Sequence, residues 1–279
     1  MSLTGVDLSS LSYPIKYPKA NYVLKIGGDP LKGKTALITG GSSGIGKATC
    51  IAFGREGANV IIVSRTESSG KATEAQLRDL GIEAKWLQAD VSNPEDIEEV
   101  MKEAKSLYGT IDYAFNNAAS SAKSGMLTEI KEEEWESAIS GILTSTFLCM
   151  KYELIIMEEQ GFGAIVNNAS VDGLRGFPMD PVYSAAKHGV IGLTKSAALQ
   201  YAKKGIRINA ICPSWTLTPR IERLLQRCPG KDEEWLQHQP IGRLGRPEEI
   251  AEAVVWLCSD KASFVLGTAL PIDGGYTAM

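Results

Sequence analysis

A glycine-rich turn constrains the fold of this chain more than any other feature. The apolar run of residues 35–38 leads into Thr39-Gly40-Gly41-Ser42-Ser43-Gly44-Ile45-Gly46, and a helix-like stretch begins at Lys47. Glycines at a tight strand-to-helix turn let the backbone approach a diphosphate, whose charge is met by free N–H groups at the helix start. Glycines alone are weak support in a chain that has 28, but strand, turn and helix together favour a dinucleotide-binding βαβ unit.

Short β-rich runs alternate with helical stretches along the rest of the chain. They predict strands near residues 36–38, 60–63, 84–87, 111–115, 164–166, 206–211 and 269–272. Stretches of helical length lie between them, among others at 94–107, 133–157 and 182–202. This rhythm predicts an α/β fold: a single-domain, doubly wound parallel sheet, or Rossmann fold, with helices on both faces and ligands at the carboxyl ends of the strands.

The predicted domain covers residues 33–279, because no linker-like stretch interrupts the rhythm. Residues 1–32 form an N-terminal extension, either a loose tail or an arm that packs on the body or on a neighbouring subunit. A segment at about 214–246 breaks the rhythm before the last strand. Such an insertion acts as a lid or is simply packed helix, and both interpretations stay open.

Composition narrows the class of partner. A net charge of −4 gives no basic surface for nucleic acid, and no apolar run approaches the ~18 residues that span a bilayer. The five cysteines are widely spread without a C-x-x-C pair, which predicts reduced thiols in a cytoplasmic protein. Only two histidines are present, so no metal site is expected. We expect a small soluble ligand.

The end of the second strand indicates the cofactor. An acid there holds the ribose 2′-hydroxyl of NAD, whereas a basic residue suits the 2′-phosphate of NADP. The sequence runs Val63-Ser64-Arg65-Thr66, with no acid from Ala58 to Thr66, and Arg65 offers a planar fork of donors. NADP(H) is therefore expected; in the alternative, Glu67 binds the ribose and Arg65 is a solvated charge.

A second group of polar residues also follows predicted strands. Tyr183 and Lys187 are four residues apart and share one face of a helix. Ser170 lies thirteen residues upstream, just past the strand at 164–166, and Asn116-Asn117-Ala118 follows the strand at 111–115. All of them are expected around one crevice.

In this ordered set of motifs the chain resembles the classical short-chain dehydrogenase/reductase family, over residues 33–279. The resemblance implies a catalytic Ser170, Tyr183 and Lys187, with the last two also binding cofactor, and a homotetramer. It implies that Asp90 and Val91 border the adenine. The other implied cofactor-binding residues are Gly40, Ser42, Ser43, Gly44, Ile45, Gly46, Arg65, Asn116, Ala118, Pro213 and Thr218.

These residue types suit the interconversion of a ketone and a secondary alcohol by hydride transfer. A tyrosine with its ordinary pKa near 10 is a poor acid–base group at neutral pH. A neighbouring Lys187 ammonium, together with the cationic nicotinamide of the oxidised cofactor, is expected to favour the phenolate and lower that pKa. Tyr183 is the expected general acid and base, and Ser170 stabilises charge on the carbonyl oxygen. The alternatives are a catalytically weak NADP(H)-binding protein and a non-redox epimerase or lyase on the same scaffold.

The chain departs from the family pattern at three positions. Ile142 occupies the place of an asparagine that anchors a proton-relay water, so the relay is weakened or rerouted, or else a register slip puts Ser140 or Thr144 there. Ala119 and Ser214 replace usual glycines. A mixed, largely apolar substrate wall is expected from Asp172, Arg175, Phe177, Trp215, Leu217 and Leu224.

Overall fold

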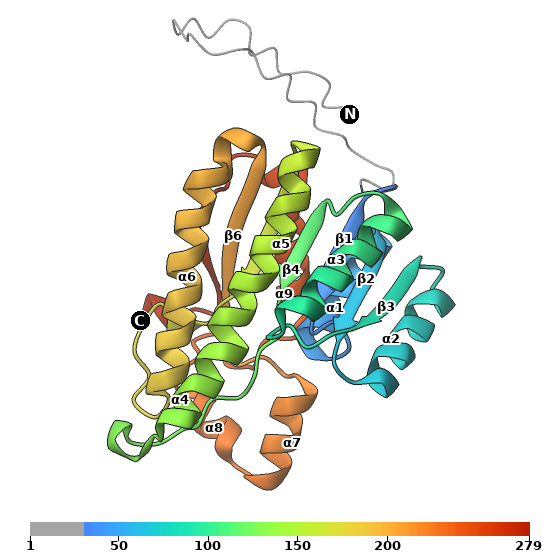
Figure 1. Ribbon diagram of the computed structural model, residues 1–279. Coiled ribbons are helices and arrows are strands. Elements are labelled where there is room, and N and C mark those ends of the chain that lie inside the picture. The colour runs from blue at the N-terminus through green and yellow to red at the C-terminus, as the bar shows by residue number, and fades with distance from the viewer. Residues whose placement is uncertain (1–30) are drawn as a thin grey trace, which may run out of the picture.

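The structure is a computed structural model that describes residues 31–279, and its core is one parallel seven-stranded sheet (Figure 1). The strand order is β3-β2-β1-β4-β5-β6-β7. The strands are β1 Thr35–Thr39, β2 Asn59–Ser64, β3 Ala84–Gln88, β4 Tyr113–Asn116, β5 Gly163–Asn168, β6 Ile206–Pro213 and β7 Ala269–Ile272. Every predicted strand overlaps one of these, and the predicted parallel sheet is confirmed.

Helices cover both faces of the sheet, as the Rossmann prediction requires (Figure 1). Side chains alternate between the faces along each strand: Ala36 and Ile38 of β1 pack with α1 and α9, while Leu37 packs with α3, α5 and α6. The helices are α1 Gly44–Arg55, α2 Glu67–Asp79, α3 Pro94–Tyr108, α4 Glu132–Ile139, α5 Ser145–Gln160, α6 Pro181–Tyr201, α7 Pro219–Arg227, α8 Lys231–Leu236 and α9 Pro247–Cys258.

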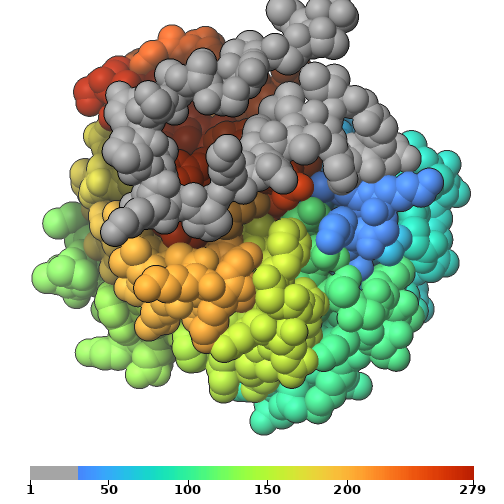
Figure 2. All heavy atoms as spheres, turned by 90° about the horizontal axis from the view of Figure 1, so that it is seen from above, coloured from blue at the N-terminus to red at the C-terminus, as the bar shows by residue number. Residues whose placement is uncertain are grey.

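The order of the strands places a crevice at one edge of the sheet. The chain builds outward from β1 to β3 and then returns to add β4 on the other side of β1. The connections that leave β1 and β4 therefore diverge, which opens a ligand site at the carboxyl ends of these strands. Figure 2 looks onto the opposite end of the molecule, where α3, α5 and α6 finish.

The predicted long helix at 133–157 is one continuous helical segment, Glu132–Gln160, interrupted by a π-helical turn at Ser140–Thr144. Its most apolar window has a mean hydropathy of 1.4, so length and composition alone would allow it to cross a membrane. Half of that window is buried inside the fold, and Cys149, Met150 and Leu154 pack against the sheet. The apolar composition is thus used to cover the sheet.

The segment at 214–246 contains two short helices that differ in packing. Trp235 of α8 is buried and stacks on Trp215, with ring centroids 5.6 Å apart. No residue of α7 is buried. A bridge between Thr216 and Gly245 joins the two ends of the segment. In the N-terminal extension residues 1–30 lie outside the described residues, so the tail and arm alternatives stay predictions.

Candidate active site

The glycine turn forms a backbone cradle at the start of α1. Gly40 and Gly44 have positive φ angles of 64° and 52°, which side-chain-bearing residues rarely adopt. A Cβ atom on Gly40 would lie 2.8 Å from Asn117 Nδ2, and one on Gly46 would lie 2.3 Å from the Gly40 carbonyl oxygen. The Ser43 side chain stands at the N-cap but accepts no hydrogen bond from the backbone N–H groups of the first turn of α1. These N–H groups are therefore free to bind a diphosphate, which fits the cradle.

Most of the predicted cofactor residues line one cavity of about 1030 Å³ that runs along this edge of the sheet. The exceptions are Gly46 and Asn116. Gly46 instead permits the close approach of α1 to the turn. The predicted residues that line the cavity are Gly40, Ser42, Ser43, Gly44, Ile45, Arg65, Asp90, Val91, Ala118, Ser170, Tyr183, Lys187, Pro213 and Thr218.

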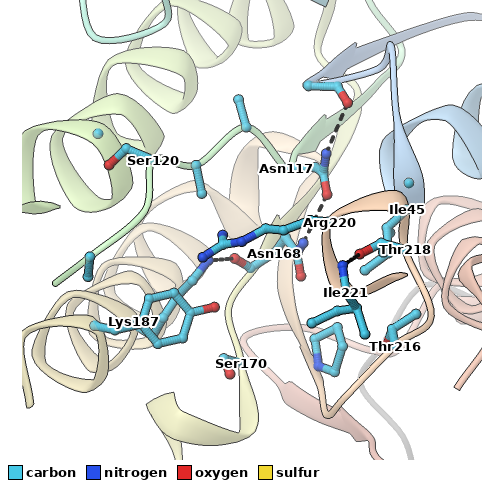
Figure 3. A pocket seen from close by; sticks show the side chains of 18 of the residues that line it. Ile45, Asn117, Ser120, Asn168, Ser170, Lys187, Thr216, Thr218, Arg220 and Ile221 are labelled. Atoms are coloured by element: carbon cyan, nitrogen blue, oxygen red, sulfur yellow. Dashed lines mark hydrogen bonds between the residues drawn. The ribbon is translucent and has the colours of Figure 1, made fainter. Parts of the chain in front are cut away.

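The expectation that Asn116 lines the cleft is corrected by the structure. Asn116 is buried, and its amide donates a hydrogen bond to Glu153 Oε2 at 3.0 Å, inside the core. Its neighbour Asn117 faces the cavity instead, because consecutive strand residues point to opposite faces. Asn117 donates to the Thr39 carbonyl oxygen at 3.1 Å. It also accepts from Asn168 Nδ2 at 2.9 Å (Figure 3). It therefore ties the glycine turn to β5.

Arg65 and Asp90 lie together at the far end of the cavity from the catalytic residues. The distance from Arg65 Nη1 to Asp90 Oδ2 is 3.7 Å, and both side chains are exposed. Glu67, the alternative ribose ligand, does not line the cavity, and its carboxylate pairs with Lys71 at 2.5 Å. Of the two predicted ligands for the adenine-side ribose, Arg65 therefore lines the cavity and Glu67 does not.

Ser170, Tyr183 and Lys187 are brought together at the other end of the cavity, and Figure 3 shows the first and last of them. Lys187 Nζ lies 5.6 Å from the centroid of the Tyr183 ring and donates to the Asn168 carbonyl oxygen at 2.5 Å. Ser170 follows β5 and caps the short 3₁₀ helix Val171–Gly173; its Oγ accepts the Asp172 N–H at 3.1 Å. Strand β5 and helix α6 thus position all three groups.

Burial controls the titration of these groups. It raises the pKa of Tyr183 to about 12; Ser170 opposes this most strongly, Asp172 adds a smaller increase, and Arg220 acts to lower the pKa. Burial also lowers the pKa of Lys187 to about 8. Among the groups of the chain itself, desolvation disfavours the phenolate more than nearby charges favour it, so the lowering expected from Lys187 together with the oxidised nicotinamide stays a prediction. At neutral pH the phenol is protonated and can donate.

Ile142 lies in the π-helical turn and faces away from the cavity. Its side chain is 1% exposed and belongs to an apolar cluster with Ala186 and Val190, against which the Tyr183 ring packs. Its carbonyl oxygen accepts hydrogen bonds from Thr146 Oγ1 at 2.7 Å and Ser145 Oγ at 3.2 Å, so the turn leaves no free acceptor at this position. Of the two polar alternatives, Ser140 lines the cavity and Thr144 does not.

Ser120 is a cavity residue that the sequence motifs did not single out. Its hydroxyl is buried without a hydrogen-bond partner in the part of the chain that the structure describes, and its N–H donates to the Gly141 carbonyl oxygen at 3.1 Å. A buried hydroxyl with spare hydrogen-bonding capacity can hold a water. The only sequence signal is its place directly after Asn116-Asn117-Ala118-Ala119.

We expect Ile142→Asn to lower the stability of the fold without raising kcat, because the amide enters an apolar cluster. The cost is about 2–4 kcal/mol from the lost apolar contacts and an unpartnered amide. Urea unfolding and steady-state rates measure both effects. Ile142→Val, with an expected cost of about 1 kcal/mol, is the matched control. A faster enzyme would show that this position does limit proton transfer.

The wall beside the catalytic residues is aromatic and apolar. Phe177, Trp215, Leu224 and Trp235 line it, together with the acid Asp172, whose pKa burial raises to about 6. Phe177 packs edge-on against Trp215, with ring centroids 6.1 Å apart. Two other predicted wall residues lie outside the cavity: Leu217, and Arg175, whose guanidinium lies 4.8 Å from the Tyr276 ring centroid.

No metal centre is found in residues 31–279: no three His, Cys, Asp or Glu side chains are grouped so that they could hold an ion. His188 lies on α6 beside Lys187, and its Nδ1 contacts the Ser184 carbonyl oxygen at 2.9 Å. It does not line the cavity.

Comparisons with known proteins agree with this geometry. A family model described as "Enoyl-(Acyl carrier protein) reductase" matches residues 40–277. The chain is 42% identical over 250 residues to a 2,5-dichloro-2,5-cyclohexadiene-1,4-diol dehydrogenase of Sphingobium indicum, covering 89% of this chain and 99% of the relative. It is 40% identical over 254 residues to a cyclohexanol dehydrogenase of Acinetobacter sp., covering 91% and 99%.

Solved structures show the same relationship. The crystal structure of a variant of actinorhodin polyketide ketoreductase with NADPH superimposes on this chain with a TM-score of 0.85 at 34% identity. The match covers 88% of this chain and 98% of that one. With a matching family model, closely similar relatives and a shared fold, the chain is an oxidoreductase of the short-chain dehydrogenase/reductase family.

Proposed function

We propose that this protein interconverts a secondary alcohol and a ketone on a carbocyclic skeleton, with NADP(H) as cofactor. The observation that carries the proposal is the layout of the cavity. Ser170, Tyr183 and Lys187 gather at one end, and the glycine cradle and Arg65 lie toward the other. Relatives named for cyclohexanol and for a cyclohexadiene diol support a ring substrate, which suits the aromatic wall.

The residues of the chain divide the chemistry between them. When bound, NADP(H) supplies or accepts the hydride. The Tyr183 phenol, protonated at neutral pH, donates its proton to the carbonyl oxygen during reduction, and its phenolate accepts the proton during oxidation. The Ser170 hydroxyl stabilises the charge that builds on that oxygen. Lys187, anchored on the Asn168 carbonyl, holds the nicotinamide ribose in place.

The activity is tested by following nicotinamide absorbance with NADPH and a panel of cyclic and acyclic ketones. Consumption of NADPH with stoichiometric alcohol formation supports the proposal. Tight NADPH binding without turnover of any ketone would favour a cofactor-binding protein. That second function is worth testing because the Ile142 carbonyl is occupied by Ser145 and Thr146 instead of being free for a relay water.

The cofactor preference rests on Arg65. We expect Arg65→Gln to weaken NADPH binding by about 10–100-fold, the value of a charge-assisted hydrogen bond, and to leave NADH binding within a few-fold. Fluorescence titration of both nucleotides measures the ratio. Arg55→Gln is the control, since Arg55 is exposed on α1 and does not line the cavity. Wild-type protein that binds NADH as tightly as NADPH would contradict the assignment.

We also propose a cytoplasmic homotetramer. Large apolar side chains are exposed on helices that cover the sheet, including Phe147 and Ile155 of α5 and Leu199 of α6. A second group, Trp256 and Phe264, lies near the end of the chain. Contacts between copies of the chain would bury these side chains. The cytoplasmic assignment is supported by the five cysteines, all of which are free thiols.

A further inference from the structure

One cation in the cavity has no partner in the part of the chain that the structure describes. Four cationic side chains line the cavity. Lys187 donates to the Asn168 carbonyl, Arg65 faces Asp90, and Lys231 pairs with Glu234 at 2.7 Å. Arg220 makes no ion pair and no hydrogen bond with residues 31–279. It therefore carries a full complement of free guanidinium donors into the cavity.

Arg220 points toward the catalytic end of the cavity. It is the second residue of α7, whose Thr218 N-cap accepts the Ile221 N–H at 3.4 Å. In Figure 3 its side chain extends from α7 away from Thr218 and toward Lys187. Its charge also reaches Tyr183, whose pKa it acts to lower against the larger effect of burial. The guanidinium is thus close to the place where a substrate would react.

The cradle for the cofactor's diphosphate lies beside Thr218, two residues before Arg220. The cradle for that group is the turn that includes Gly44, and a Cβ atom on Gly44 would lie 3.1 Å from Thr218 Cγ2. Thr218 therefore marks the cradle side of α7, and Arg220 leads away from it (Figure 3). We take the anion that meets Arg220 to lie on the substrate, and the experiments below separate this from a contact with the cofactor.

We propose that Arg220 is a specificity-determining residue that binds a carboxylate on the substrate. The inference rests on the proposed function and names its substrate class: a ring ketone or alcohol with a carboxylate some bonds away from the reacting carbon. The planar guanidinium fork matches a carboxylate in a two-bond arrangement. Leu224, one helical turn after Arg220, and the stacked Trp215 and Trp235 would receive the ring.

Two acids restrict where that carboxylate can lie. Asp172 and Asp180 line the same end of the cavity, and Asp180 accepts a hydrogen bond from Ser124. Neither acid pairs with Arg220. Both therefore repel the carboxylate of the substrate, which leaves Arg220 as the favourable contact for that carboxylate. The arrangement would hold the substrate in one orientation, with its charged end at α7 and its carbonyl at Ser170 and Tyr183.

A binding experiment tests the inference without turnover. Cyclohexanecarboxylate and its neutral amide, cyclohexanecarboxamide, are titrated calorimetrically into the NADP⁺-loaded protein. The wild type is expected to prefer the carboxylate, and Arg220→Met to lower carboxylate affinity by about 10–100-fold. Arg223→Met is the matched control, because Arg223 is exposed on the same helix but does not line the cavity. Equal losses for acid and amide would overturn the inference.

A kinetic experiment separates this inference from the proposed function. With NADPH and either 4-oxocyclohexanecarboxylate or its methyl ester, Arg220→Met should lower the acid-to-ester ratio of kcat/KM at least tenfold, chiefly through KM. A wild type that prefers the ester, or a variant whose main defect is NADPH affinity, would refute the role of Arg220. If carboxylate binding depends on Arg220 but neither compound is turned over, the result would contradict the proposed function and leave the role of Arg220 intact.

Discussion

Tyr183→Phe is expected to lower kcat for ketone reduction by about 10²–10⁴-fold, the usual contribution of a general acid, while the Kd for NADPH changes little. The phenol shares the cavity with Ser170, which influences its pKa, and its ring centroid lies 5.6 Å from Lys187 Nζ. Phenylalanine keeps the ring that packs against the cluster of Ile142, so the fold is expected to survive. Stopped-flow and steady-state rates, with fluorescence titration of NADPH, measure the two quantities.

Tyr113→Phe is the matched control for this experiment. Tyr113 is also buried, at 3% exposure, but it lies in β4 and packs against Phe53, away from the cavity. The Tyr113→Phe variant also loses a phenol hydroxyl, but this hydroxyl lies outside the cavity in which the reaction is proposed to take place. If Tyr183→Phe kept near-normal turnover, proton transfer would have to use another group, and Ser120 and Ser140 would be the first to examine because both line the cavity.

The parts of the fold that follow from local sequence were predictable. The glycine turn has positive φ angles at Gly40 and Gly44. Such a turn binds a dinucleotide only when a strand precedes it and a helix follows it. The apolar runs that form β1 and β2 are buried on both faces, which is the pattern of a parallel sheet. Short-range pattern and chain topology therefore placed the carboxyl ends of the strands, and with them the site.

What the sequence did not predict depends on which way a side chain points and how deeply it is buried. Asn116 and Asn117 are identical residues, and only the register of β4 sends one into the core and the other to the cavity. The pKa of Tyr183 is the balance of burial against neighbouring charge, and burial cannot be counted from motif spacing. Likewise, to predict that Arg220 has no ion-pair partner, one needs the positions of all acidic side chains around it, and the sequence alone does not give them.

Glu153 is a buried acid that belongs to neither the motifs nor the cavity. It lies on α5 with no exposed surface, and its Oε2 accepts a hydrogen bond from Asn116 Nδ2. Its Oε1 and the Asn116 Oδ1 are both buried without a partner among the described residues. A proton on Oε1 would supply a donor for Oδ1 and complete a two-bond acid–amide pair. Consistent with this, burial raises the pKa of Glu153 to about 8.

Glu153→Gln is therefore expected to become the more stable protein as pH rises. In the unfolded chain the carboxyl releases its proton near its ordinary pKa of 4.5, whereas in the folded protein it holds the proton up to about pH 8. The folded state binds more protons across this window, so the wild type loses stability between these two values, by roughly 1.4 kcal/mol per pH unit and about 3–5 kcal/mol in all. Glutamine is neutral throughout and can still pair with the Asn116 amide.

The difference between the two proteins should be small near pH 5 and largest near pH 8, and urea unfolding at several pH values measures it. Glu158→Gln is the control: Glu158 lies on the same helix but forms an exposed pair with Lys204, which contributes at most about 1 kcal/mol. A pH-independent difference between wild type and Glu153→Gln would mean that Glu153 is ionised in the fold. Glu153 Oε1 and Asn116 Oδ1 would then both lack a proton donor, and α5 would carry an uncompensated buried charge beside Asn116 at the end of β4.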